Sequence, residues 1–357
     1  MNPNPKSNFM KKSLSVLLLS LATFTASTSL QAQSALQGGL VENADVFMYM
    51  DIAKMNQSPF YEAMDALQSP EDQALAEEKM AKFTKATGLT EDDIITLTFS
   101  MDIDDIDFQA QDPDELEDAQ AVVAIELAKS ITLDQAKAGL ESMSEENEMK
   151  AELTIATVDG MDVIVLESKG GEQGPDKAFG TLSEDGKTFL MAFNTMSLKD
   201  ATARITAGKA AEPTEDMSIA MDTVGDRQTR MILVLPPVAR QKIKEGIETT
   251  AAQGGMGGMM MPFATAKSLI ISANTTENLD FYLSLDLGEP GNAAQAAGMV
   301  QSMLPMMMMS MGPQAMELSQ KIEIAPQDSV VTVSVTLTPD DINAMGEAAQ
   351  ADGMDME

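Results

Sequence analysis

The residue type with the most distinctive chemistry in this chain is methionine, which gathers in two tracts. Residues 302–312 read SMLPMMMMSMG, and residues 254–262 read GGMGGMMMP. Thioethers are soft ligands that select Cu(I) or Ag(I) over hard cations. The first tract therefore offers six candidate soft-metal ligands: Met303, Met306, Met307, Met308, Met309 and Met311.

The same tract has two other interpretations. Methionine is a flexible apolar residue that fills irregular gaps and adaptable surfaces, and this chain has 31 methionines but no histidine to supplement the sulfurs. We therefore rank packing first, an apolar partner surface second and a soft-metal site third. Leu304 precedes Pro305, so the helix expected here should kink or restart at the proline.

Several catalytic residue types are missing from the chain. It has no histidine, cysteine or tryptophan, and it has three tyrosines. The absence of histidine and cysteine excludes Ser-His-Asp and Cys-His nucleophiles, thiol redox chemistry and cysteine-ligated zinc. The densest acidic cluster, 102–118, fails the register of an EF-hand calcium loop. We predict no catalytic residues, no cofactor and no enzymatic activity.

The formal net charge is −33, and the acids are spread along the chain. A field of that sign repels nucleic acid and anionic lipid surfaces. We expect a solvated acidic surface and no nucleic-acid partner.

Residues 1–32 are typical of a secretory signal peptide. Three lysines precede an apolar run at 14–26, and a polar stretch then ends at Ala32. No later segment reads as a membrane span. We predict a periplasmic or secreted protein with no integral membrane segment after cleavage and an unknown protein partner in the envelope.

Strands and capped helices alternate through a first unit, 33–208. Residues 45–52 and 121–128 are β-rich, and 94–103 alternate apolar residues with Thr, Ser and Asp. Asp159-Gly160 and Asp185-Gly186 are typical of hairpin turns. Helices are expected to begin at four capping residues: Ser58, Ser69, Thr132 and Ser197.

A polar connection at 209–216 leads to a second unit, 217–346, and the chain ends in an acidic tail at 347–357 that we expect to be disordered. The second unit repeats the order strand, helix, two strands, helix, two strands. Its expected strands are 230–235, two runs within 268–288, 321–324 and 329–338, and its expected helices are 238–250, one from Asn292 and one after Thr338.

The shared element order predicts an internal duplication, in which 151–168 stand against 321–338. Each strand carries one apolar face and one Thr/Ser/Asp face, so helices should cover each sheet on one side only. The predicted fold is α+β: two similar two-layer units with mainly antiparallel sheets, each covered by helices on one face.

The opening ADVFMYMDIAKM after a signal peptide, the segment FGTLSEDGKTFLMAFNTMSLKDATARI and the duplicated order resemble a group of exported bacterial proteins of unknown function. The resemblance covers nearly all of the mature chain as a pattern. It implies export, and it carries over no activity and no functional residue.

These observations favour a non-catalytic exported envelope protein, a structural or partner-binding scaffold. Two alternatives stay open. One is Cu(I) or Ag(I) handling through the methionine tracts, and the other is carriage of an apolar ligand between helices and sheet.

Overall fold

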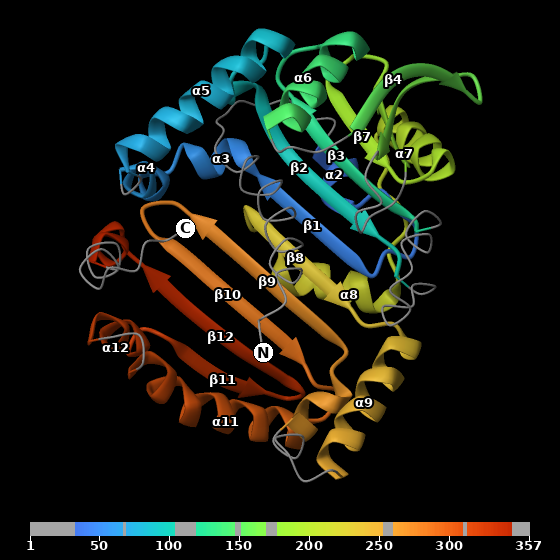
Figure 1. Cartoon of the computed structure of the whole chain (residues 1–357). Coiled ribbons are helices and arrows are strands. Elements are labelled where there is room, and N and C mark those ends of the chain that lie inside the picture. The colour runs from blue at the N-terminus through green and yellow to red at the C-terminus, as the bar shows by residue number, and fades with distance from the viewer. Residues whose placement is uncertain are drawn as a thin grey trace, which may run out of the picture.

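A computed structural model describes residues 33–66, 69–103, 119–146, 151–168, 177–252, 260–309 and 313–344. The fold is α+β and is built on one antiparallel 12-stranded sheet (Figure 1). The strands are β1 (Val46–Asp51), β2 (Ile94–Met101), β3 (Ala121–Leu127), β4 (Ala151–Val158), β5 (Met161–Ser168), β6 (Lys177–Leu182), β7 (Thr188–Ala192), β8 (Thr229–Val234), β9 (Ser268–Thr275), β10 (Leu279–Asp286), β11 (Glu323–Gln327) and β12 (Val330–Leu337).

The sheet is continuous across the point where the two predicted units meet. Its strand order is β11-β12-β10-β9-β8-β1-β2-β3-β7-β6-β5-β4. β1 pairs with β2 on one side and with β8 on the other. The prediction of a separate sheet for each unit was wrong, because nothing in the apolar runs of β1 and β8 marks them as either edge or central strands. We call β1–β7 the first half of the sheet and β8–β12 the second half.

Helices cover both faces of the first half. The main helices of the chain are α2 (Gln33–Gly38), α3 (Ile52–Asn56), α4 (Pro59–Asp65), α5 (Pro70–Thr87), α6 (Leu133–Glu146), α7 (Thr195–Ala207), α8 (Glu215–Val224), α9 (Pro237–Ala252), α11 (Pro290–Met309) and α12 (Pro313–Ser319). On the face called the front here, α3, α5 and α6 lie over β2, β3 and β7. On the back face, α2 and α7 pack against β3, β5 and β7.

The hydroxyl face of β2 shows why one-sided cover was the wrong prediction. Thr96, Thr98 and Ser100 are fully buried. Thr98 Oγ1 donates to Leu36 O over 3.1 Å, and Ser100 Oγ accepts from Leu40 N over 3.0 Å. Because these hydroxyls satisfy the backbone of α2 and the segment after it, a polar strand face can be buried at little cost.

The second half has thinner cover. On the front face, α11 packs over β11 and β12, together with the short 3₁₀ turn η4 (Met261–Thr265). On the back face, α8 packs against β8 and β9. Tyr282 and Ser334, farther out on the back face, are only half-buried.

Most local signals agree with the structure. Ser58 Oγ accepts from Tyr61 N at the start of α4, and Thr132 and Gln135 form the expected reciprocal cap. Asp159 and Gly160 both have positive φ, as a type I′ turn requires. A last helix follows Thr338 at residues 339–344.

Two boundaries differ from the sequence expectation. Asn194, not Ser197, caps α7: its Oδ1 accepts from Ser197 N over 2.8 Å. Thr214 caps α8, so helix begins inside the expected connection at 209–216. At α7, Asn194 and Ser197 are both capping residue types, and residue type alone does not choose between them. At α8 the sequence reasoning predicted no helix, so the whole element was missed.

Candidate binding surface

The methionine tract forms the exposed end of α11. The first turns of this helix bury Ala293, Ala296 and Ala297 against the sheet, and their small side chains let the helix lie close to it. The methionines follow in the later turns of the helix, where Met306 is 73% exposed and Met309 is 70% exposed. The helix runs through Pro305 to Met309 as one element, so of the two predicted outcomes, a kink or a restart, the restart does not occur.

The six candidate ligands are only partly brought together. Met303, Met306 and Met309 follow at intervals of three, lie along one side of the helix and are all exposed. Met308 is half-buried. The side chain of Met307 and the whole of Met311 lie outside the described residues. The packing interpretation therefore does not hold for the exposed thioethers of Met306 and Met309.

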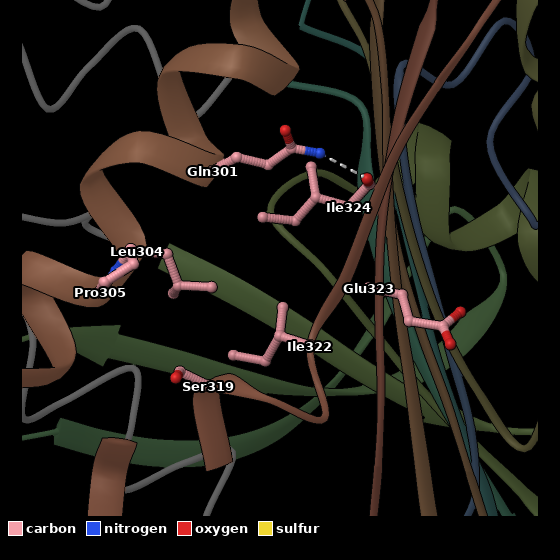
Figure 2. A pocket seen from close by; sticks show the side chains of 7 residues that line it. All are labelled: Gln301, Leu304, Pro305, Ser319, Ile322, Glu323 and Ile324. Carbon is pink, nitrogen blue, oxygen red and sulfur yellow. Dashed lines mark hydrogen bonds between the residues drawn. The ribbon is translucent and has the colours of Figure 1, made fainter. Parts of the chain in front are cut away.

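A cavity of about 450 Å³ opens between α11, α12 and β11, and none of the described methionines is among its lining residues. Figure 2 shows the side chains of Leu304, Ile322 and Ile324 turned toward one another across it, while Glu323 points away. Gln301 Nε2 donates to Ile324 O over 2.9 Å and ties α11 to β11. The residues that line the cavity are Gln301, Leu304, Pro305, Ser319, Ile322, Glu323 and Ile324. Sequence reasoning missed this cavity because it exists only where α11, α12 and β11 meet.

An apolar row leads from the middle of the front face to this cavity. By strand register, side chains of six neighbouring strands stand opposite one another in turn: Met48, Met231, Ile271, Leu283, Val333 and Ile324. Met231 is 39% exposed, and Ile324 lines the cavity. In Figure 1 the labelled helices α5 and α11 lie to either side of β9 and β10. The row therefore ends at the edge of a cavity whose lining is both apolar and polar.

The described end of the second methionine tract, at η4, lies near the start of α11. Residues 253–259 are outside the described residues, and Met260 and Met261 are exposed at η4. Phe263 of η4 packs in the same cluster as Ala293. Because an α-helix rises about 1.5 Å per residue, Met306 lies about 20 Å farther along α11 than Ala293. Met260 and Met261 therefore do not join Met306 in one site.

A buried polar group at the junction of the two halves also escaped sequence reasoning. The Arg230 guanidinium lies 4.5 Å from the centroid of the Tyr49 ring, and its Nη1 donates to Gly225 O over 3.3 Å. Its Nε is buried without a hydrogen-bond partner in the described chain. Burial raises the pKa of Tyr49 to about 12 and lowers the pKa of Arg230.

Glu126 belongs to the same buried layer. It is 2% exposed, and its Oε2 accepts from Thr96 Oγ1 over 3.2 Å. Burial raises the pKa of Glu126 to about 6, against the smaller opposing effect of the Thr96 hydrogen bond. Glu126 and Arg230 are thus both buried within the sheet, at 2% and 6% exposure.

Most of the acidic cluster at 102–118 lies outside the described residues. In the described part of the chain, no three His, Asp or Glu side chains come together in a way that could hold a metal ion. Across the same residues, no helix combines the length and apolar character needed to cross a membrane.

Comparison with known proteins adds little. No family model and no curated protein sequence matches the chain. One solved structure, crystal form I of TP0453, is similar over 90% of this chain and 98% of its own, with 7% sequence identity and a TM-score of 0.38. A likeness this distant carries no argument about fold or function.

Proposed function

We propose that this protein is a non-catalytic exported binding protein, whose methionine-bearing end of α11 receives an apolar segment of a protein partner in the envelope. The observation that carries the proposal is the exposure of Met306 and Met309 along one side of the end of α11. Large exposed apolar side chains in one patch are typical of interaction sites. Methionine suits such a surface because its flexible thioether adapts to the shape of a partner.

Site-specific photo-crosslinking tests this proposal. A photoreactive residue at position 306 should give a discrete adduct in envelope extracts, and Met306→Gln together with Met309→Gln should abolish partner binding. Met196 on α7 is a matched control, since it is 65% exposed but far from the cavity. An adduct of equal yield from position 196 would contradict the assignment.

The soft-metal alternative is supported by the spacing of Met303, Met306 and Met309 on one exposed side of α11. Leucine separates the two functions, because it keeps an apolar side chain and removes the sulfur. Met306→Leu with Met309→Leu should retain partner binding if the surface recognises apolar groups. If the protein handles Cu(I), the same variant should lose competition against a Cu(I) chelator.

Carriage of an apolar ligand is supported by the apolar row that ends at Ile324 in the cavity. Cavities of this size hold small ligands. Mass spectrometry of a solvent extract of the purified protein should then show a lipid or another apolar compound at stoichiometric yield. A clean extract would remove this alternative.

Export is part of the proposal and rests on the signal-like residues 1–32. Fractionation of cells followed by N-terminal sequencing should place the mature protein outside the cytoplasm, with its first residue near Gln33. Recovery of the uncleaved chain in the cytoplasm would remove the envelope partner from consideration.

We also infer that the chain arose by internal duplication, and the strand order supports this. Outward from the junction, the first half reads β1-β2-β3-β7-β6 and the second half reads β8-β9-β10-β12-β11. In this scheme β11 and β12 correspond to β6 and β7, which replaces the sequence alignment of 321–338 with 151–168. β4 and β5 have no counterpart. A crystal structure whose halves fail to superpose over these ten strands would end the inference.

A further inference from the structure

The two edges of the sheet are built differently. β11 forms one edge and β4 the other. β11 has five residues and carries Pro326, and the carbonyl oxygen of Ile324 accepts a hydrogen bond from Gln301. A short strand with a proline and an occupied carbonyl is closed to further pairing.

Among the residues that the structure describes, β4 has none of these protections. It pairs with β5 at all eight of its positions, Ala151 to Val158, without a bulge. In a hairpin with a two-residue turn, the two residues that flank the turn exchange both backbone hydrogen bonds. The backbone N–H and C=O of Val158 therefore point toward β5. Every second residue from Thr157 back to Ala151 directs its N–H and C=O outward. Neither proline nor lysine interrupts the strand. This regular outer edge is a template for one more strand.

The chemistry of β4 indicates what that strand is. β4 carries one charged side chain, Glu152, in a chain whose formal charge is −33. Ile155 is 41% exposed near the middle of the strand. A cationic partner would find little to neutralise here, whereas a neutral β-rich strand would cover Ile155. β4 itself is such a strand.

We propose that two copies of this chain associate through β4, by antiparallel pairing about a two-fold axis at Ile155. In this register Ile155 meets Ile155 of the other copy, Leu153 stands opposite Thr157, and Glu152 stands opposite Val158. No like charges face each other across the axis, and paired β-branched residues stabilise antiparallel strands. A self-complementary patch of this kind is the usual basis of a two-fold dimer.

The contact is small, which sets its strength. Eight residues extend about 27 Å, and with a sheet thickness of about 10 Å the strand covers a few hundred Å² per copy. Stable interfaces cover roughly 800 Å² per partner. The dimer is therefore weak and depends on concentration. Because each copy is strongly acidic, added salt should strengthen the dimer by screening the repulsion between copies.

A dimer of this geometry leaves the proposed partner surface free on both copies. β4 and α11 lie at opposite ends of the sheet (Figure 1). Two methionine-bearing surfaces on one assembly would bind a bivalent or polymeric partner more tightly than one surface does. The association through β4 does not rest on that partner, so the two proposals fail separately.

Sedimentation equilibrium over a wide concentration series, at low and high salt, tests the association. Ile155→Lys should weaken it at least about ten-fold, equivalent to about 1.4 kcal/mol. Ile219→Lys is the matched control, because Ile219 is also an exposed isoleucine, 58% exposed on α8, and the charge change is the same. A wild-type chain that stays monomeric throughout, or an equal effect of both substitutions, would overturn the proposal.

Disulfide trapping tests the register. The chain contains no cysteine, so Ile155→Cys introduces a single thiol next to its symmetry mate, within the Cα separation that a disulfide spans. Mild oxidation should give a covalent dimer in high yield, and Ile219→Cys should not. Comparable yields from both variants would reject the register. Circular dichroism of each variant verifies that it is folded.

Discussion

Thr98 in β2 and Thr332 in β12 make nearly the same hydrogen bond in the two halves of the sheet. Each donates Oγ1 to a backbone carbonyl oxygen over 3.1 Å, Thr98 to Leu36 and Thr332 to Ala325. The first bond is buried and crosses from the sheet to α2, whereas the second is exposed and stays between neighbouring strands. The difference lies in what covers the strand and not in the strand itself.

The two halves also differ in how completely helices cover the two faces of the sheet. In the first half, α2 and α7 on the back and α3, α5 and α6 on the front bury strands on both sides. In the second half, β10 and β12 keep half-buried residues on both faces. We infer that stability is concentrated in the first half and that the second half is free to present a binding surface.

The largest expected effect comes from truncating a leucine in each half. Leu190 of β7 is fully buried, and Leu283 of β10 is half-buried. Leu190→Ala should lower the free energy of unfolding by about 3–5 kcal/mol, because it leaves a cavity that cannot fill with water. Leu283→Ala should cost about 1–2 kcal/mol, because less apolar surface is removed from a packed environment. Urea denaturation of both variants measures the contrast, and equal losses would break the comparison.

The next effect depends on pH and belongs to Glu126. Its folded-state pKa of about 6 lies above the ordinary value of 4.5, so the fold favours the protonated form. The carboxyl group therefore contributes most to stability below about pH 4.5, and this contribution is lost as the pH rises through 6. Near pH 7.5 the ionised group costs the fold about 2 kcal/mol.

Glu126→Gln removes that cost and can keep the hydrogen bond from Thr96. The variant should be about 2 kcal/mol more stable than the wild type near pH 7.5, and the difference should shrink toward zero near pH 4.5. Glu323→Gln, at an exposed position of β11 in the second half, is the control for the loss of one negative charge. Urea denaturation across the pH series measures both, and a gain that is independent of pH would show that burial does not perturb Glu126.

Local structure was largely predictable from the sequence. The turn at Asp159-Gly160, the caps at Ser58 and Thr132 and the period-two strand at 94–101 depend on neighbours in sequence, and each is where the residues indicate. The α+β class follows from the same alternation of elements. Such features are decided within a few residues, so the chain's distant contacts do not alter them.

The sequence did not predict which strand faces are covered by segments that are distant along the chain. The hydroxyl face of β2 has the composition of a solvated face, yet α2 lies over it because residues 33–38 return to the sheet. The exposure of Met306 and Met309 contradicts the first-ranked packing interpretation for these two residues, because α11 extends past the side chains that bury its first turns. Composition specifies which surfaces are apolar or polar, and the packing of distant segments decides which of them meet water.

The smallest expected effect concerns Thr98 and Thr332. It separates the effect of burial under a helix from the chemistry of the strand itself. Thr98→Val removes the donor to Leu36 O and leaves that carbonyl oxygen buried without its partner, which should cost about 1–2 kcal/mol. Thr332→Val makes the same change where water can replace the lost bond, so its effect should stay within about 0.5 kcal/mol. Because valine has nearly the shape of threonine, the difference between the two variants measures the burial of the hydrogen bond. If Thr332→Val costs as much as Thr98→Val, the outer strands of the second half are as well covered as β2, and the proposed division between a stable half and a binding half fails.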